Sequence, residues 1–267
     1  MIERVLTGQG RVVFMIGAPV AQTRAPYLFN HRFAETDSNR VMAPLEVPTE
    51  RLAQFIDTVR GAENCEGFVA TAPHKAALVD LMDGLSSRAQ ALGLVNVVRR
   101  NDDGTLTGEM LDGPGFWAGA AAAGVVPKGR RIVLGGGGAA GAAIALSYAE
   151  GGGREIAHLG TPNETARLAA LVAPLGTTVQ ANLPVSLEAH DMVINATPVG
   201  MAHEPGCLFT RELLATLPPD AMVADTITAP LETELLRRAR ALNLSCLDGN
   251  AMTRGQFDQL WGFLRLP

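Results

Sequence analysis

The chain has 267 residues, of which 47% are hydrophobic and 18% charged, a composition typical of a globular protein with one large α/β domain or two smaller ones. Its formal net charge of −5, without any basic cluster, argues against nucleic-acid binding, and no apolar stretch approaches the roughly 20 residues of a membrane helix. Residues 1–17 contain an early acidic residue and too short an apolar run for a signal peptide. Three widely spaced cysteines and five scattered histidines predict reduced thiols, no metal site and a cytoplasmic location.

The first part of the chain predicts an α/β unit. Apolar runs and periodic segments alternate in this order: strand 11–17, helix 24–36, strand 41–47, helix 50–59, strand 67–71 and helix 73–81. Thr49 is placed to cap the second of these helices. Residues 94–100 and 103–110 predict two strands that meet at an Asp-Asp-Gly hairpin turn. We therefore expect residues 1–112 to form one domain with its own core.

The pattern changes after this point and predicts a second domain over residues 113–245. Its segments are, in order, strand 131–135, a glycine-rich turn with a small-residue helix, strand 154–160, helix 163–176, apolar runs 178–183, 191–197 and 221–227, and helix 231–243. Strands that alternate with helices predict a parallel, doubly wound sheet. The amphipathic pattern of 252–266 predicts a last helix, and we expect residues 246–267 to return to the first domain.

The glycine-rich turn, LGGGGAAGAA, is the strongest local motif. The dinucleotide fingerprint G-x-G-x-x-[GA] fits it in two overlapping frames, one that starts at Gly135 and one that starts at Gly136. Glycines at such a turn let backbone N–H groups and a helix N-terminus approach a pyrophosphate, although glycine runs also serve as simple tight turns. The strand before the motif and the helix after it favour a nucleotide site.

The choice of cofactor depends on the tip of the next strand. NAD sites usually carry an acidic residue there for the ribose hydroxyls, whereas NADP sites carry an arginine for the 2′-phosphate. We identify neither group at this tip: His158 and Thr161 are the nearest polar side chains, and Arg167 lies well into the helix. NAD and NADP both stay open, and the missing basic clamp favours NAD.

Lys75 and Asp112 are the candidate catalytic residues. On its own stretch of sequence, Lys75 is better explained by a lysine that reaches the solvent, and Asp112 can be explained by an Asp-Gly turn. Both follow predicted strands, however, and ligands of two-domain α/β proteins bind beyond strand ends. A lysine beside a carboxylate forms a proton-transfer pair suited to the oxidation of an alcohol.

Over nearly its full length the chain resembles the shikimate and quinate dehydrogenases. The matching stretches, in order, are GAPVAQTRAPYLFN, GFVATAPHK, LGLVNVV, GEMLDGPGF, VLGGGGAAGAA, NATPVGM, DTITAPLET and DGNAMTRGQFDQLW. The resemblance implies an N-terminal α/β substrate-binding domain and a Rossmann-type dinucleotide-binding domain. It also implies a small cyclic hydroxy acid as the substrate, NAD or NADP as the cofactor, and a monomer or homodimer.

The resemblance also implies roles for individual residues. Lys75 and Asp112 would be the catalytic pair, acting on the substrate hydroxyl while hydride passes to the nicotinamide. Thr71, Asn96 and Gln256 would bind the substrate. The residues expected to border the cofactor are Gly135, Gly137, Gly138, Ala139, Ala140, Thr161, Asn195, Thr197, Pro198, Gly200, Met201, Gly249 and Met252.

Several positions depart from the family pattern. Thr23 and Ala25 replace two serines that bind the substrate carboxylate, Arg24 replaces the leucine between them, and Thr228 replaces a tyrosine of the same site. Leu111, Val69 and the stretch GTPNET replace a threonine, an asparagine and the arginine-containing N-R-T-x-x-R motif. Retained catalytic residues with replaced recognition groups predict a shifted substrate. We hypothesise that Thr23 and Arg24 bind an anionic group; the alternative for Arg24 is an exposed arginine at a helix start.

The leading function is therefore an oxidoreductase that transfers a hydride between a nicotinamide cofactor and shikimate, quinate or a related cyclic hydroxy acid. A different class is a catalytically weak or inactive homologue that binds a nucleotide or metabolite as a sensor, since eroded recognition motifs are what such a protein would show. A third possibility keeps the dehydrogenase in an auxiliary role in aromatic or secondary metabolism. Retention of both Lys75 and Asp112 favours the dehydrogenase.

Overall fold

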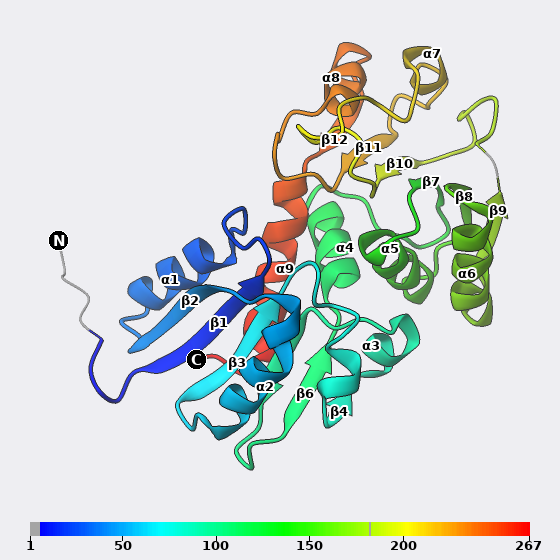
Figure 1. The fold of residues 1–267 in the computed structure, drawn as a ribbon. Helices are drawn as coiled ribbons and strands as arrows, with labels where there is room; N and C mark the ends of the chain where they lie inside the picture. Colours follow the sequence, from blue (N-terminus) through cyan, green and yellow to red (C-terminus); the bar gives the residue numbers. More distant parts are fainter. Residues whose placement is uncertain (1–5, 182) are drawn as a thin grey trace. The chain divides into compact units, whose positions relative to one another are not determined.

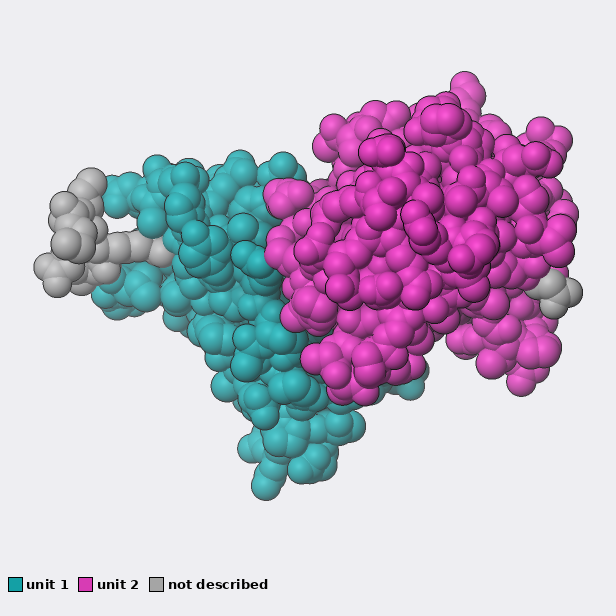
Figure 2. All heavy atoms as spheres, turned by 90° about the horizontal axis from the view of Figure 1, so that it is seen from above, with its two compact units in different colours: residues 1–111, 257–267 teal, residues 112–256 magenta. Residues whose placement is uncertain are grey.

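The computed structural model describes residues 6–181 and 183–267. Two predictions fall partly outside these ranges. One is the signal-peptide assessment, which uses residues 1–5, and the other is the strand 178–183, which contains Asn182. By its internal contacts the chain divides into unit 1, residues 1–111 with 257–267, and unit 2, residues 112–256 (Figure 2). Relative to the predicted boundaries, Asp112 falls in unit 2, and the returning C-terminal segment starts at Phe257 instead of 246.

Unit 1 is built on a six-stranded mixed sheet with the strand order β2-β1-β3-β5-β6-β4 (Figure 1). Its strands are β1 (Arg11–Gly17), β2 (Arg40–Glu46), β3 (Cys65–Ala70), β4 (Gly84–Leu85), β5 (Val97–Arg100) and β6 (Leu106–Glu109). β1 pairs in parallel with both β2 and β3, so the carboxyl ends of these strands lie at one edge of the sheet. β5 and β6 pair antiparallel, which confirms the predicted hairpin.

Helices cover both faces of this sheet. Alternate residues of a strand point to opposite sides, and in β1, after its first residue, both sets of side chains are apolar and need a cover. On one face, α1 (Ala25–Glu35) and the end of α9 (Gly249–Phe263) pack over Val13 and Met15. The ring centroids of Phe33 in α1 and Trp261 in α9 are 5.0 Å apart. On the other face, Phe14 meets Phe55 of α2 (Leu52–Gly61) edge to face. The predicted C-terminal amphipathic helix thus forms, and its last turns complete the core of unit 1.

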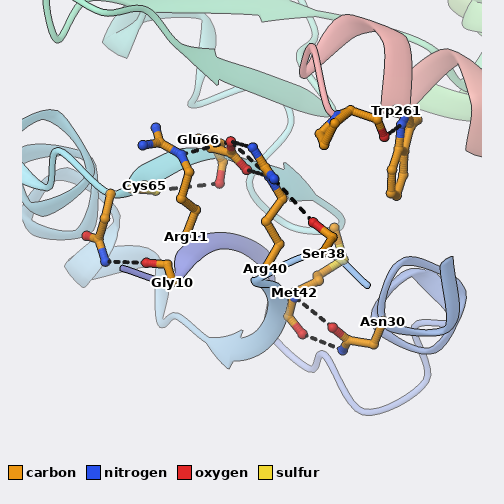
Figure 3. Close-up of polar contacts among 12 residues, drawn as sticks. Gly10, Arg11, Asn30, Ser38, Arg40, Met42, Cys65, Glu66 and Trp261 are labelled. Atoms are coloured by element: carbon orange, nitrogen blue, oxygen red, sulfur yellow. Dashed lines mark hydrogen bonds and ion pairs between the residues drawn. The ribbon is translucent and has the colours of Figure 1, made fainter. Parts of the chain in front are cut away.

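Polar contacts hold the starts of the three parallel strands together (Figure 3). The guanidinium groups of Arg11 and Arg40 both bind the carboxylate of Glu66, with N–O distances of 2.9 Å. Asn30 of α1 donates its amide to the Met42 carbonyl and accepts from the Met42 N–H, at 2.8 and 2.9 Å. These bonds set the position of α1 against β2 and the register of β1, β2 and β3 at their first residues.

Two local predictions in unit 1 are wrong. Residues 72–78 form irregular turns and Val79–Leu81 a short 3-10 helix, where a helix over 73–81 was expected. The cause is a long-range contact: the Lys75 carbonyl accepts the Val95 N–H at 2.8 Å, so it is used outside the helical ladder. Thr49 begins a 3-10 turn (Thr49–Arg51) before α2 and does not cap it, since α2 starts at Leu52 with no side-chain cap.

Unit 2 contains a six-stranded sheet in which every described pairing is parallel, with the strand order β12-β11-β10-β7-β8-β9 (Figure 1). Its strands are β7 (Arg131–Gly135), β8 (Glu155–Leu159), β9 (Thr178–Ala181), β10 (Met192–Asn195), β11 (Met222–Asp225) and β12 (Ser245–Leu247). The chain winds outward first from β7 to β9 and then from β10 to β12. This confirms the predicted doubly wound α/β fold and puts its topological switch point between β7 and β10.

The helices of unit 2 lie between these strands in sequence. They are α4 (Asp112–Ala122), α5 (Ala139–Glu150), α6 (Pro162–Val172), α7 (Arg211–Leu214), α8 (Glu234–Ala241) and the first turns of α9. Val133, Val193 and Val223 of adjacent strands pack with Leu214 of α7 and Leu236 of α8 in one core cluster. The short elements α7, β12 and α3 (Ser87–Leu92) carry no sequence signal that we recognised. Within the described ranges, no helix has the length and apolar character to cross a membrane.

Candidate active site

Lys75 lies in the turn that follows β3 in unit 1, and the backbone around it is anchored on both sides. The Thr71 N–H donates to the Ile16 carbonyl at 2.9 Å, which ties the start of the turn to β1. The fully buried His74 ring lies with Nε2 2.8 Å from the Val47 carbonyl, and burial lowers the pKa of this imidazole. The Lys75 side chain is half-buried. A lysine on such a fixed turn keeps one location without being sealed from solvent.

Asn96 joins three segments of unit 1 at the start of β5. It is 2% exposed, its Oδ1 accepts the Leu111 N–H at 2.8 Å, and its carbonyl accepts the Ala70 N–H at 2.8 Å. Since β3 and β5 are neighbours in the sheet, Thr71, Lys75 and Asn96 come from adjoining strand ends. The predicted substrate asparagine therefore also has a structural task.

Thr23 and Arg24, the proposed anion-binding residues, follow β1 and precede α1. The Thr23 hydroxyl donates to the Val20 carbonyl at 2.8 Å, so its proton is used locally and only its oxygen lone pairs stay available. Arg24 is exposed at the position before the first turn of α1 and makes no side-chain cap. Both alternatives for Arg24 are compatible with this location.

Asp112 is the first residue of α4 in unit 2 and is 5% exposed. Its Oδ1 accepts a hydrogen bond from Nε2 of Gln256 in α9 at 2.9 Å. A carboxylate in the first turn of a helix is stabilised by the helix dipole. The structure thus brings together two residues 144 positions apart, the predicted catalytic aspartate and the predicted substrate glutamine.

Glycine contacts allow α4 and α9 to approach closely enough for this bond. A Cβ atom on Gly115 of α4 would lie 2.5 Å from Cβ of Gln256, and one on Gly255 of α9 would lie 2.3 Å from the Gly115 carbonyl oxygen. Real Cβ atoms do not approach other atoms this closely, so any larger residue would force the helices apart. Gly115, one of the glycines of GEMLDGPGF, is therefore explained by the packing of α4 on α9 that positions Asp112.

The glycine-rich turn links β7 to α5 at the topological switch point of unit 2. Gly136 has φ of +90°, which favours glycine, and a Cβ on Gly141 would lie 2.1 Å from the Gly136 carbonyl oxygen. Gly138 is exposed before the first turn of α5, with nothing within 4 Å of a Cβ there. The three glycines of a dinucleotide-binding turn have these roles: one allows the tight turn, one lets the backbone approach the pyrophosphate, and one lets the helix pack closely. Of the two sequence frames, the geometry fits the one that starts at Gly136, and the turn suits a pyrophosphate.

The other predicted positions of this turn have different surroundings. Gly135 is the last residue of β7, and Ala139 and Ala140 are the first residues of α5. A Cβ on Gly137 would lie 2.6 Å from Cβ of Glu164, so the turn packs directly on the start of α6. Gly136 and Gly141 were missing from the predicted set, although the second frame contained them.

A carboxylate that the sequence analysis missed, that of Glu164, lies at the tip of β8. Thr161 caps α6, and Glu164 Oε2 accepts both the Thr161 N–H at 2.8 Å and the Thr161 hydroxyl at 2.9 Å. Both bonds lower the pKa of the Glu164 carboxyl, and the bond from the Thr161 N–H has the larger effect. The carboxyl is therefore ionised. The Arg167 guanidinium donates to the Gly137 carbonyl. The spacing Thr161-x-x-Glu164 is that of a capping box and was the available signal.

Asn195 ends β10 beside the glycine-rich turn and shapes the loop NATPVGM. Its amide donates to the Val199 carbonyl and to Asp225 Oδ1, at 2.9 and 3.2 Å, while its Oδ1 accepts the N–H and hydroxyl of Thr197. Asp225 is 1% exposed, and burial raises the pKa of its carboxyl. Thr233 donates its hydroxyl to Asp225 at 2.7 Å. These polar groups of Asn195 and Thr197 thus stabilise the conformation of the loop itself.

The remaining predicted residues of unit 2 lie in two loops and at the start of α9. Gly200 has φ of +115°, and Pro198 and Met201 flank it in the same loop. Thr228 is half-buried in the loop after β11, where a Cβ on Gly249 would lie 2.3 Å from the Ile227 carbonyl oxygen. Met252 is half-buried in the first turns of α9. No group of three or more His, Cys, Asp or Glu side chains in the described part of the chain is placed to hold a metal ion.

Comparison with known proteins identifies the family. Residues 15–98 match the family model described as the shikimate dehydrogenase substrate binding domain. The NADP(+) shikimate dehydrogenase of Methylobacterium radiotolerans is 38% identical over 251 residues, which cover 90% of this chain and 86% of that protein. The chain belongs to the shikimate dehydrogenase family. This confirms the predicted resemblance.

Solved structures of related enzymes have the same fold as this family member. The shikimate 5-dehydrogenase of Listeria monocytogenes, in complex with shikimate and NAD, is 25% identical with a TM-score of 0.88, and the alignment covers 100% of this chain and 95% of that one. The ligand-free 5-ketofructose reductase of a Gluconobacter strain is 26% identical with a TM-score of 0.87, with coverage of 97% and 94%. The proteins similar to this chain are thus named for different substrates and cofactors.

Proposed function

We propose that this shikimate dehydrogenase family member is an NAD(P)-dependent dehydrogenase that interconverts a CH–OH group of a cyclic hydroxy acid, or a related polyol, and the corresponding ketone. The observation that carries the proposal is the buried Asp112 carboxylate held by Gln256 at the start of α4, in the same unit as a glycine turn suited to a pyrophosphate. Family membership supports the dehydrogenase over the sensor, because the named relatives are enzymes of this class.

In the proposed reaction Lys75 accepts the proton of the substrate hydroxyl during oxidation, and Asp112 stabilises the resulting ammonium. Gln256 keeps the Asp112 carboxylate in one orientation through its 2.9 Å bond to Oδ1. A bound nicotinamide dinucleotide supplies the hydride acceptor for this chemistry. Gly136, Gly138 and Gly141 would give the turn the shape that holds its pyrophosphate at the N-terminus of α5.

Within this function we propose NAD as the preferred cofactor. The ionised Glu164 lies at the tip of β8, against Gly137 of the turn, which is the region where Rossmann sites bind the adenosine ribose. A carboxylate there accepts a hydrogen bond from a free ribose hydroxyl and repels a 2′-phosphate. Arg167 contributes a positive charge nearby, but its guanidinium is engaged with the Gly137 carbonyl.

For the substrate we propose an anionic group bound by Thr23 and Arg24, with Thr71, Asn96 and Thr228 as further contacts. Arg24 is exposed and offers the planar donor pair that binds a carboxylate. The 5-ketofructose reductase among the relatives favours a neutral sugar ketone as the second candidate. An unchanged KM of Arg24→Ala for every accepted acid would exclude the anionic contact.

A dehydrogenase screen tests the proposal directly. Wild type and Lys75→Ala are assayed with NAD and NADP against shikimate, quinate and neutral cyclic polyols, while cofactor binding is measured by calorimetry. Cofactor reduction by the wild type that disappears in Lys75→Ala supports the enzyme. Tight cofactor binding without turnover of any compound supports the sensor. The cytoplasmic location and the choice between monomer and homodimer stay predictions.

A further inference from the structure

A polar hollow of about 530 Å³ lies in unit 1, at the end of the sheet where β1 and β3 begin. Thr71 and Lys75 follow the other end of β3, so the hollow is separate from the candidate active site. Five arginines from four segments line it: Arg11 at the start of β1, Arg60 near the end of α2, Arg99 and Arg100 at the end of β5, and Arg265 after α9.

Two of these arginines are neutralised by carboxylates. Arg11 shares Glu66 with Arg40, a contact visible in Figure 3, and Arg60 pairs with Asp83. The other acidic side chains of the lining, Glu63, Asp102 and Asp103, are exposed to water. Their charges are therefore strongly screened.

Arg99 and Arg100 are partly buried and have neutral partners only, as far as the described residues go. Arg99 donates to Asn101 Oδ1 and to the Phe263 carbonyl, at 3.1 and 3.2 Å, and its guanidinium lies 5.0 Å from the Phe263 ring centroid. Arg100 donates to the Val59 and Arg60 carbonyls at 3.1 Å or less. Two half-desolvated cations thus lack an anion, a costly arrangement that a bound anion would relieve.

Arg265 adds a third charge to this group. Its backbone has φ of +55°, a left-handed conformation that is uncommon for a residue with a side chain. Burial, followed by the like charge of Arg265, lowers the pKa of Arg99. Capping of the ends of α2 and α9 explains why Arg99 and Arg100 contact backbone carbonyls. It gives no reason for the exposed Arg265 beside them.

We propose that this hollow binds the phosphate group of a small metabolite, with Arg99 and Arg265 as the principal ligands. Guanidinium groups bind phosphate oxygens in pairs of parallel hydrogen bonds, which makes arginine the preferred residue for such groups. The volume exceeds that of an inorganic ion and lies within the range of small-molecule sites. The proposal is independent of the dehydrogenase function.

The test is a titration of the ¹⁵N-labelled full chain with inorganic phosphate at constant ionic strength, followed through the amide signals of Asn101, Gly104 and Arg265. We expect saturable shifts of these signals and an affinity reduced about tenfold in Arg265→Gln. Arg154→Gln, which removes an exposed arginine of unit 2, is the matched control and should titrate like the wild type. Arg265→Lys keeps the charge without the paired donors and should bind with intermediate affinity.

A phosphate monoester, glycerol 3-phosphate, forms the second arm. If it shifts the same signals, the ligand is the phosphoryl group of a larger metabolite; if only inorganic phosphate does, the ligand is the free ion and the proposed metabolite is wrong. Absence of saturable shifts in the wild type, or equal affinities of the wild type and Arg265→Gln, would overturn the site altogether. The arginines would then serve only to cap the two helices.

Discussion

The Gln256 amide donates a hydrogen bond of 2.9 Å to the Asp112 carboxylate, and this bond joins α9 to the first turn of α4. Asp112 is buried at the start of its helix, so its orientation depends on the few groups that reach it. The neutral amide fixes the direction of the carboxylate oxygen that it binds without adding a charge of its own. Gln256 is thus a positioning residue for the proposed catalytic carboxylate, in addition to any contact with substrate.

Gln256→Ala should lower kcat about 10- to 100-fold while the Kd for the dinucleotide stays unchanged. The loss corresponds to roughly 1–3 kcal/mol for a buried polar group deprived of its partner. Steady-state kinetics and calorimetric titration of the cofactor measure the two quantities. Gln180→Ala, an exposed glutamine on β9 of the same unit, is the control and should behave like the wild type. A wild-type kcat in Gln256→Ala would contradict the positioning role.

Gly115→Ala should destabilise the protein by about 1–3 kcal/mol, because the added methyl group overpacks the contact between α4 and α9. The new Cβ would lie 2.5 Å from Cβ of Gln256, so the substitution should also lower kcat by displacing that side chain. Urea unfolding measures the free energy of unfolding. Gly262→Ala, in the last turns of α9 with nothing within 4 Å, is the matched control and should be neutral or stabilising. Equal unfolding curves for Gly115→Ala and the wild type would show that the helices adjust freely.

The architecture could be predicted from the sequence because the signals that determine it are local. The alternation of strands and helices and the hairpin between β5 and β6 follow from apolar periodicity and turn residues, and both appear in the structure. The turn around Lys75 could not be predicted in this way. Its conformation depends on the bond from the Val95 N–H to the Lys75 carbonyl, a contact between residues 20 positions apart that no local pattern contains.

The sequence predicted which types of residue form the site better than it predicted the role of each residue. Asn195 was expected beside the cofactor, but its side chain is used by Val199, Thr197 and Asp225, so it acts on the loop first. Glu164 was overlooked because its distance from the strand tip along the sequence hides its position against the glycine turn. Such assignments depend on how side chains fold back onto the backbone, which spacing alone does not specify.

Glu164→Gln should shift the ratio of the Kd values for NADP and NAD about tenfold toward NADP. The substitution removes the negative charge that would repel a 2′-phosphate, and glutamine at this position keeps the capping box of α6 intact. Calorimetry with each dinucleotide measures the ratio without relying on turnover. Glu188→Gln, an exposed glutamate of the same unit, should leave the ratio unchanged. If the wild type already binds NADP more tightly than NAD, the proposed role of Glu164 is wrong.

Stability should fall as the pH drops below about 6.5, because three histidines are buried in the folded protein. His74, His158 and His190 are at most 7% exposed, and burial lowers the pKa of each. In the unfolded chain they bind protons near pH 6.5, so between that pH and their folded pKa values the unfolded state holds more protons. The free energy of unfolding therefore decreases with falling pH through this window and is largely independent of these groups above pH 7.

Urea unfolding between pH 7.5 and 5 measures this decrease, and the variants separate the contributions. Each histidine that stays neutral in the folded state contributes up to about 1.4 kcal/mol per pH unit within the window. His74→Gln retains an amide donor for the Val47 carbonyl and should flatten the pH dependence, even if it lowers stability at pH 7.5. His31→Gln, an exposed histidine on α1, should leave the dependence unchanged. A pH dependence that is the same in His74→Gln and the wild type would mean that His74 becomes protonated as readily in the folded chain as in the unfolded one.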